Sequence, residues 1–174
     1  MDDAGAAFAE VLADLPLYAP EGERRRGRIS STALAPGGDL PLKVVVDFGS
    51  TPHGPDHGPE LEIATRRWDR GALDERDIRG FCGERDLMER RMRDPLSAQS
   101  FSLPEGAVWS RYPITVDGTR RTFTVLCTAH SWVAAAPLPG SLLVRVFTPA
   151  PGPGPAALRR ITSIEDLEPV RGRG

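Results

Sequence analysis

The sequence predicts a single α+β domain in which an antiparallel-rich sheet is packed by helices. Three observations support this fold class: a meander of alternating runs over residues 107–148, two strand patterns near 42–48 and 60–66, and a helical pattern at about 74–93. Apolar residues recur at period two in a half-buried strand and near period 3.6 in an amphipathic helix. The chain has 174 residues, enough to bury a core without disulfides or a metal.

The pair Asp117-Gly118 sets the register of the first hairpin in the meander. An Asp-Gly pair between two alternating runs is a strong hairpin signal, because a type I′ turn needs positive φ at both central residues. Counting outward from this loop places Tyr112 opposite Phe123 on a mainly apolar face. A slip of one residue would send the two rings to opposite faces. We therefore expect these rings to be buried neighbours.

Two more strands follow the hairpin. The pattern predicts a third strand over 130–136, with Trp132 beside Cys127, and a fourth over 142–147 whose continuous apolar character indicates a central position. Pro113 has no backbone N–H to donate to a neighbouring strand, so the first strand of the meander is expected to lie at an edge of the sheet or to bend there. With the strands near 42–48 and 60–66, we expect a sheet of five to seven strands.

Two helices are expected to cover the sheet. Residues 3–15 show an N-terminal amphipathic pattern that ends at Pro16. The longer helix, at about 74–93, has Asp74 as its cap and Pro95 as its stop. Its apolar residues share one face: Ile78, Phe81, Cys82, Met88 and Met92.

The remaining segments carry weaker patterns. Residues 16–40 are rich in Pro, Gly and Arg and are expected to wrap the surface or to be partly mobile, and residues 149–155 form a Pro-rich connector. Residues 158–167 fit either a helical turn or a last strand. Cys82 and Cys127 resemble small buried apolar residues, although the sequence leaves open whether they pair.

Composition excludes several classes of function. The net charge of -2 argues against general affinity for nucleic acid. The sequence has no apolar run long enough to cross a membrane and no secretory signal pattern. Two cysteines without a framework pattern fit a reducing compartment. We therefore expect a cytoplasmic protein that binds neither nucleic acid nor membrane.

One loop has residues that suit a divalent metal such as zinc. Asp47 ends the strand near 42–48, and His53, Asp56 and His57 follow within ten residues. Imidazole and carboxylate groups are common zinc ligands, but the histidine spacing is most effective on a helix and this loop is full of Gly and Pro. A small metal-dependent enzyme or ligand-binding protein using this loop is the alternative interpretation.

The favoured interpretation is a non-enzymatic interaction protein of an accessory, regulatory or immunity type. The chain has no nucleophile elbow, Walker loop, Rossmann fingerprint or paired Cys-x-x-Cys motif, so no catalytic residue and no cofactor is expected. One face of the meander mixes apolar and basic side chains. We expect this face to bind a protein partner or a second copy of the chain through Trp109, Arg111, Arg120, Leu126 and Val133.

Overall fold

The computed structural model describes residues 15–34, 36, 41–49, 59–93, 106–129, 131–149 and 152–168, which form one sheet and one α-helix. The N-terminal helix expected over 3–15 lies outside the described residues except for Leu15, which is buried. The elements are β1 (Tyr18–Pro20), β2 (Arg28–Leu34), β3 (Pro41–Phe48), β4 (Leu61–Arg67), α2 (Glu75–Arg93), β5 (Val108–Val116), β6 (Thr119–Cys127), β7 (Ser131–Leu138), β8 (Leu142–Pro149), β9 (Ala157–Arg160) and the 3-10 turn η1 (Ile164–Asp166).

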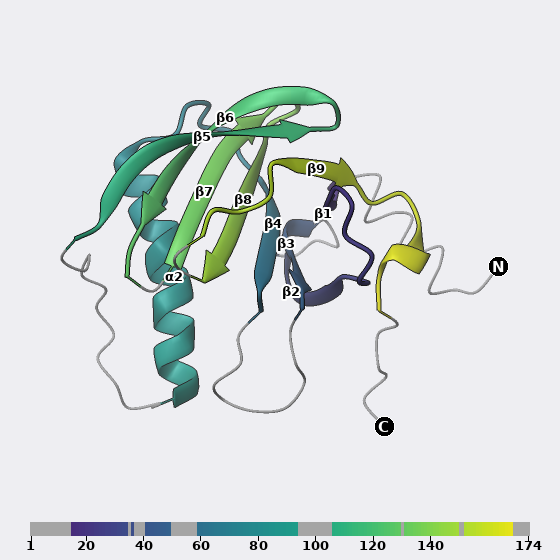
Figure 1. Ribbon diagram of the computed structural model, residues 1–174, viewed down its shortest axis with the longest axis horizontal. Helices are drawn as coiled ribbons and strands as arrows, with labels where there is room; N and C mark the ends of the chain where they lie inside the picture. Colours follow the sequence, from purple (N-terminus) through teal and green to yellow (C-terminus); the bar gives the residue numbers. More distant parts are fainter. Residues whose placement is uncertain are drawn as a thin grey trace.

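The strands form one curled sheet in the order β1-β9-β5-β6-β7-β8-β4-β3-β2. Figure 1 shows the hairpin of β5 and β6 arching over one end, while β1 and β9 cross in front of the strands at the other. Every strand pairing is antiparallel except that of β5 with β9, which makes the sheet mixed. The expected α+β class is therefore confirmed in its broad form.

The register predicted for the first hairpin is confirmed. Tyr112 lies directly opposite Phe123, as counted from the turn. Asp117 has a φ of 47° and Gly118 a φ of 75°, as a type I′ turn requires. The turn also anchors the hairpin, because Asp117 Oδ1 accepts a hydrogen bond from the backbone N–H of Arg160 in β9 at 2.9 Å.

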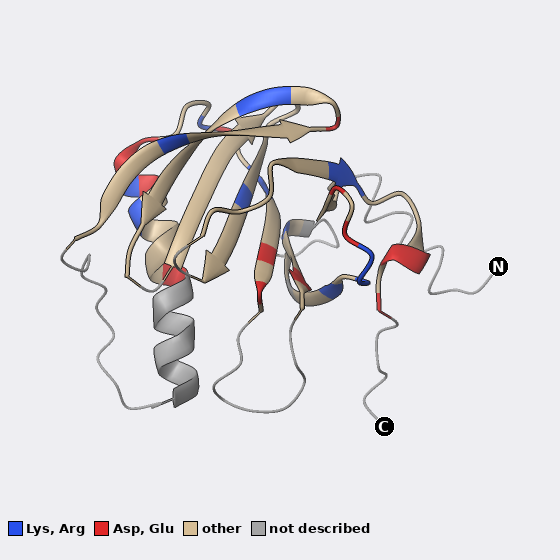
Figure 2. Cartoon of the chain, viewed as in Figure 1, with Lys and Arg blue, Asp and Glu red and all other residues tan. Residues whose placement is uncertain are grey.

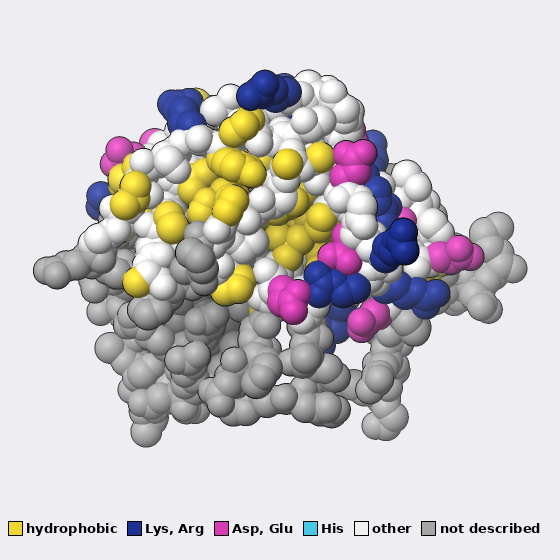
Figure 3. All heavy atoms as spheres, in the orientation of Figure 1, with side chains coloured by type: hydrophobic (Ala, Val, Ile, Leu, Met, Phe, Trp, Pro, Cys, Tyr) yellow, Lys and Arg dark blue, Asp and Glu magenta, His cyan; other side chains and the backbone are white. Residues whose placement is uncertain are grey.

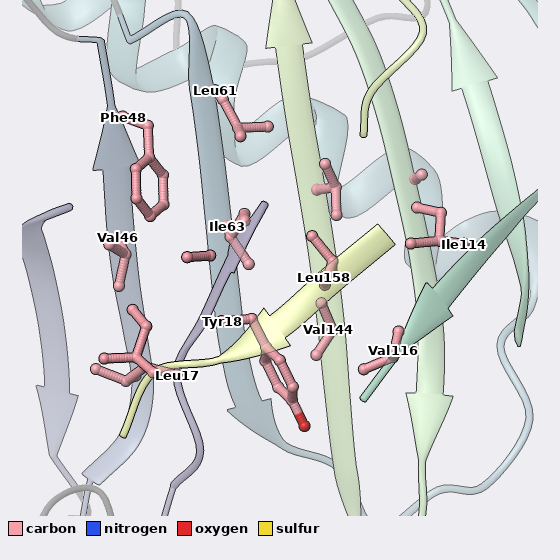
Figure 4. Close-up of a cluster of buried hydrophobic side chains, with 14 of the residues drawn as sticks. Leu17, Tyr18, Val46, Phe48, Leu61, Ile63, Ile114, Val116, Val144 and Leu158 are labelled. Carbon is pink, nitrogen blue, oxygen red and sulfur yellow. The ribbon is translucent and has the colours of Figure 1, made fainter. Parts of the chain in front are cut away.

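The inner face of the curled sheet encloses the main core. Figure 4 shows side chains from β3, β4, β5 and β8 with Leu158 of β9 and Leu17 and Tyr18 at β1. Leu158 is 1% exposed and Phe123 is not exposed at all. Within the described residues, β1 and β9 thus pack against part of the inner face of the sheet to which they belong.

A backbone bridge joins the two ends of the curl. Gly27, which leads into β2, donates to the carbonyl of Asp166 at 2.8 Å and accepts from the N–H of Glu168 at 2.7 Å. A Cβ at Gly27 would lie 2.5 Å from Cγ1 of Val46, so only glycine allows this close approach to β3.

Helix α2 covers the outer face of β6, β7 and β8. Asp74 caps it as predicted, since Asp74 Oδ1 accepts from the N–H of Asp77 and the Asp77 carboxylate accepts in return from the N–H of Asp74. Ile78, Phe81 and Cys82 are buried as expected. The side chains of Met88 and Met92 lie outside the described residues. The buried residues of α2 pack with Leu126 and Val133 on the outer face of the sheet. The helix therefore does not cover the opposite face, which holds Tyr112 and Phe123 and is the inside of the curl.

The expectation for residues 16–40 is corrected. This segment contains β1 and β2, and Leu17, Tyr18 and Ala19 are buried in the main core. The described sheet therefore has nine strands and not five to seven. Burial raises the pKa of the Tyr18 hydroxyl, and the nearby Asp117 carboxylate adds to the rise.

The segment over 158–167 resolves the question of whether it forms a helical turn or a strand. Residues 158–167 contain both forms that the pattern allowed, because β9 is followed by η1. In the connector, Gly152 and Gly154 lie against the indole of Trp132, where an added Cβ would approach to 2.7 Å and 2.6 Å. Cys82 and Cys127 do not form a disulfide with each other. In the described part of the chain, no helix combines the length and the apolar character needed to span a membrane.

Candidate functional site

The structure divides the predicted interaction face into a covered part and an open part. Leu126 and Val133 are buried against α2, with exposures of 0% and 1%, so the expectation that they form a binding surface needs correction. Trp109 is half-buried at the margin of this cluster. Arg111 and Arg120 are exposed, and neither forms an ion pair with a described residue.

The open part of this face borders the outer edge of β5. In an antiparallel hairpin, residues alternate between hydrogen-bonded and non-hydrogen-bonded pairs, and members of the second kind direct their backbone groups away from the partner strand. The two-residue loop makes Tyr112 and Phe123 a hydrogen-bonded pair, so Trp109, Arg111 and Pro113 direct their backbone groups outward.

Strand β9 confirms this alternation and occupies only part of the edge. The N–H of Thr115, which belongs to the same outward set, donates to the carbonyl of Ala156 at 2.9 Å. Pairing with β9 extends over Thr115 and Val116 alone. Within the described ranges, no strand pairs with the outer edge of β5 between Val108 and Ile114.

The sequence predicted an edge or a bend at Pro113, and this residue lies on the part of β5 that β9 leaves unpaired. Its position is outward-facing, so its missing N–H costs no bond to β6. The described residues before β9 do not cover the edge either, because Gly152 and Gly154 lie against Trp132 of β7. Next to the edge, Val108 is 59% exposed. Figure 3 shows apolar side chains gathered over the sheet on the face seen there, whereas charged side chains gather toward β1 and η1.

Of the four candidate metal ligands, only Asp47 is described. Asp47 is 6% exposed at the end of β3, while His53, Asp56 and His57 lie outside the described residues. Among the residues that are described, no group of three metal-ligating side chains comes together. Asp47 Oδ2 lies 3.6 Å from Nη2 of Arg28, so a guanidinium already faces this carboxylate.

A buried ion pair beside Asp47 was not anticipated from the sequence. Glu62 is the cross-strand neighbour of Asp47, and it accepts a hydrogen bond from Arg145 of β8. Both side chains of this pair are only 6% exposed. Glu84 of α2 lies over the pair, with its Oε2 3.7 Å from Nη1 of Arg145 and 3.2 Å from Nζ of Lys43. Figure 2 shows the acidic positions of β3 and β4 on adjacent strands.

A signal for this pair was present in the sequence. Arg145 interrupts the otherwise apolar run over 142–147, and Glu62 lies on a strand of alternating character. A single charge inside a buried run requires a partner, because burying an unpaired charge is costly. The small side chains of Ala64 and Ala135, on the two neighbouring strands, leave room for the guanidinium.

The two cysteines have polar contacts at the end of the β6–β7 hairpin. Cys82 is 4% exposed, and its Sγ lies 3.7 Å from Ser131 Oγ. Cys127 Sγ donates to the carbonyl of Thr128 at 3.8 Å.

Comparison of the chain with protein-family models, with curated proteins and with solved structures found no match.

Proposed function

We propose that this chain is a non-enzymatic interaction protein, of an accessory, regulatory or immunity type, that binds an extended peptide along the outer edge of β5. One observation supports the proposal above all: the outward-facing backbone groups of Trp109, Arg111 and Pro113 have no strand partner among the described residues. Addition of a peptide strand to such an edge is a common mode of recognition.

Backbone hydrogen bonds would supply part of the affinity. Trp109 and Arg111 each offer an N–H and a carbonyl, and Pro113 offers a carbonyl alone. A typical net contribution is about 1 kcal/mol for each hydrogen bond. Side-chain contacts would therefore set specificity. Beyond Pro113 the edge is occupied by β9, which limits the added strand to the first half of β5.

The flanking side chains favour an acidic peptide with one apolar residue. Arg111 and Arg120 lie on the outer face of the hairpin, and both are exposed. A carboxylate of the peptide beside Arg111 would form a charge-assisted hydrogen bond. An apolar side chain two positions along would lie on the same face as Trp109, because side chains of a strand alternate between faces.

A proline substitution tests the proposal without disturbing the hairpin. Arg111→Pro removes the outward N–H, as the natural Pro113 does two residues later, and leaves every bond to β6 in place. The matched control Arg111→Ala removes the charge but keeps the N–H. Peptides would be selected from a displayed random library against the unmodified chain, and their affinities for both variants measured.

We expect the selected peptides to be acidic, to bind Arg111→Ala several-fold more weakly, and to bind Arg111→Pro more weakly still. Equal binding to the unmodified chain and to Arg111→Pro would contradict strand addition. Failure of the unmodified chain to select any peptide would contradict it as well. The charge-reversal control Arg79→Glu, on the exposed side of α2, is expected to leave binding unchanged.

The alternative function, a small metal-dependent enzyme or ligand-binding protein, has one supporting observation. Asp47 is a buried carboxylate at the start of the predicted metal loop, with His53, Asp56 and His57 as its further candidate ligands. Metal analysis of the purified chain tests this alternative. A stoichiometric divalent ion that is lost in His53→Ala and His57→Ala would favour it over the peptide site.

A further inference from the structure

Strand β9 occupies the outer edge of β5 directly after the proposed peptide site. The N–H of Thr115 donates to the carbonyl of Ala156 at 2.9 Å, and the N–H of Asp117 donates to the carbonyl of Leu158 at 3.1 Å. Figure 1 shows β9 beside the end of β5, and the two strands run in the same direction. A peptide strand added along residues 109–113 would therefore meet β9 end to end.

Strand β9 is held too firmly to make way for a longer peptide. Its Leu158 is 1% exposed in the main core. On its other side β9 pairs with β1, and the N–H of Ile161 donates to the carbonyl of Leu17 at 2.8 Å. Displacing β9 would expose this core and break backbone hydrogen bonds on both sides of the strand. An added strand must therefore end beside Pro113 or leave the edge at that point.

The side chains around Pro113 give this end of the site a positive charge. On the outer face of the hairpin, the row formed by Pro113 and Thr122 lies midway between Arg111 and Arg120. Each arginine is two positions away along its strand, or about 7 Å. Both arginines are exposed, and the sequences of β5 and β6 contain no acidic residue. A group at the end of the added strand would therefore lie between two positive charges.

The charge at this end favours one direction for the added strand. A strand antiparallel to β5 would bring its amino terminus beside Pro113, where its ammonium group and the two guanidinium groups would repel one another. A strand parallel to β5, as β9 is, would bring its carboxyl terminus there. A carboxylate accepts charge-assisted hydrogen bonds from guanidinium groups. The positive end therefore suits a chain that terminates in a free carboxylate.

We propose that the edge of β5 recognises the carboxyl terminus of a partner protein. The last residue lies beside Pro113, its carboxylate is bound between Arg111 and Arg120, and the strand runs parallel to β5. Side chains of one face follow at every second position, so an apolar side chain four residues before the end lies beside Trp109. Capture of a terminal carboxylate is a recurring mode of peptide recognition. This inference rests on the proposed peptide site and specifies its ligand.

Synthetic peptides with three different carboxyl ends test the inference on the full chain. Random heptapeptides are attached to an array through their amino ends, with a free carboxylate, with a carboxamide, or with an added Gly-Gly-carboxamide. Dissociation constants of the strongest sequences are then measured in solution by fluorescence anisotropy. We expect the free carboxylate form to bind about tenfold more tightly than either other form, or better, because only this form offers a charged acceptor at the end of the strand.

The outcomes separate this inference from the peptide site on which it rests. Equal binding of the carboxylate and carboxamide forms would overturn recognition of the chain end, while weaker binding of the same peptides to Arg111→Pro would still support strand addition. Tighter binding of either carboxamide form would also overturn recognition of the chain end. No binding of any form would overturn both proposals.

Substitution of Arg120 locates the carboxylate. Arg120→Ala leaves every backbone group of the β5 edge in place, and it is expected to lower the preference for the carboxylate form severalfold while affinity for the carboxamide form is retained. The matched control Arg160→Ala removes an exposed arginine from β9, and its preference should equal that of the unmodified chain. A preference unchanged by Arg120→Ala, or lowered equally by both substitutions, would contradict the placement of the carboxylate.

Discussion

Replacement of Arg145 by Met should destabilise the protein by about 3–5 kcal/mol, the usual cost of leaving one buried charge without its partner. Arg145 and Glu62 are each only 6% exposed, and they are hydrogen-bonded to one another. Glu84 cannot compensate for the loss, because it is also an acid. The variant therefore leaves Glu62 buried beneath α2 without the guanidinium that now faces it.

Replacing both partners should be far less harmful than replacing one. Removal of two well-matched charges together also removes their desolvation costs, and such changes are often neutral or stabilising. Nε of Arg145 is buried with no hydrogen-bond partner among the described residues, and this defect disappears in the double variant. Apolar side chains fit the site, since Leu143 and Phe147 flank Arg145 on the same face and are buried. We expect Glu62→Leu/Arg145→Met to fall within about 1 kcal/mol of the parent, or above it.

Urea denaturation of four proteins completes the double-mutant cycle. These are the parent, Glu62→Leu, Arg145→Met and the double variant. The free energy of unfolding is compared at equal m-value, which establishes that the extent of unfolding is unchanged. A cost below about 1 kcal/mol for Arg145→Met would show that the pair is solvated. A double variant that loses the sum of the two single costs would show that the two side chains act independently, and the reasoning would fail.

Three further predictions concern the helix, the turn and the ion pair between Glu23 and Arg25. Phe81→Ala should cost about 3–5 kcal/mol in urea denaturation, because this ring is 4% exposed between α2 and the sheet, and a loss below about 1 kcal/mol would contradict its place in the core. Gly118→Val should lower the melting temperature, since a β-branched residue resists a φ of 75°, and an unchanged transition would contradict the turn type. Glu23 has a pKa lowered from 4.5 to about 2, so its stabilising effect is present above pH 4.5 and is lost as the pH falls toward 2. The stability difference between the parent and Glu23→Gln should shrink across that interval, and a constant difference would contradict the assignment.

Local signals in the sequence predicted the parts of the fold that depend on local chemistry. The register of the first hairpin follows from the positive φ values that Asp117-Gly118 adopts, and these are properties of two adjacent residues. The cap of α2 likewise depends on Asp74 and Asp77 alone. In both cases turn or cap chemistry and the apolar pattern agree, and the structure confirms the prediction.

Of the two strands missed within residues 16–40, β1 depends on a distant partner, whereas β2 pairs with β3, the next strand in the chain. β1 has three residues and pairs with β9, which lies about 140 positions further on. Neither strand has an alternating apolar pattern long enough to predict a strand from the sequence. The Pro, Gly and Arg content of residues 16–40 favours a loop in isolation. In the structure, that segment is held by the pairing of β2 with β3 and by the bridge between Gly27 and Leu167.

The predicted binding face failed in part for a similar reason. An apolar corner on one strand face can be covered by a helix or by another molecule, and the sequence does not distinguish these cases. Here α2 covers Leu126 and Val133, while β1 and β9 pack against part of the inner face.

Amide hydrogen exchange along β5, followed residue by residue by NMR, tests the open edge most directly. The N–H groups of Ser110 and Tyr112 face β6 and should be protected in the isolated chain, whereas those of Trp109 and Arg111 face outward and should exchange quickly. Addition of a selected peptide should slow exchange at Trp109 and Arg111 without changing Ser110 and Tyr112. Slow exchange at all four amides in the isolated chain would show that the edge is already covered, and it would contradict the proposed peptide site.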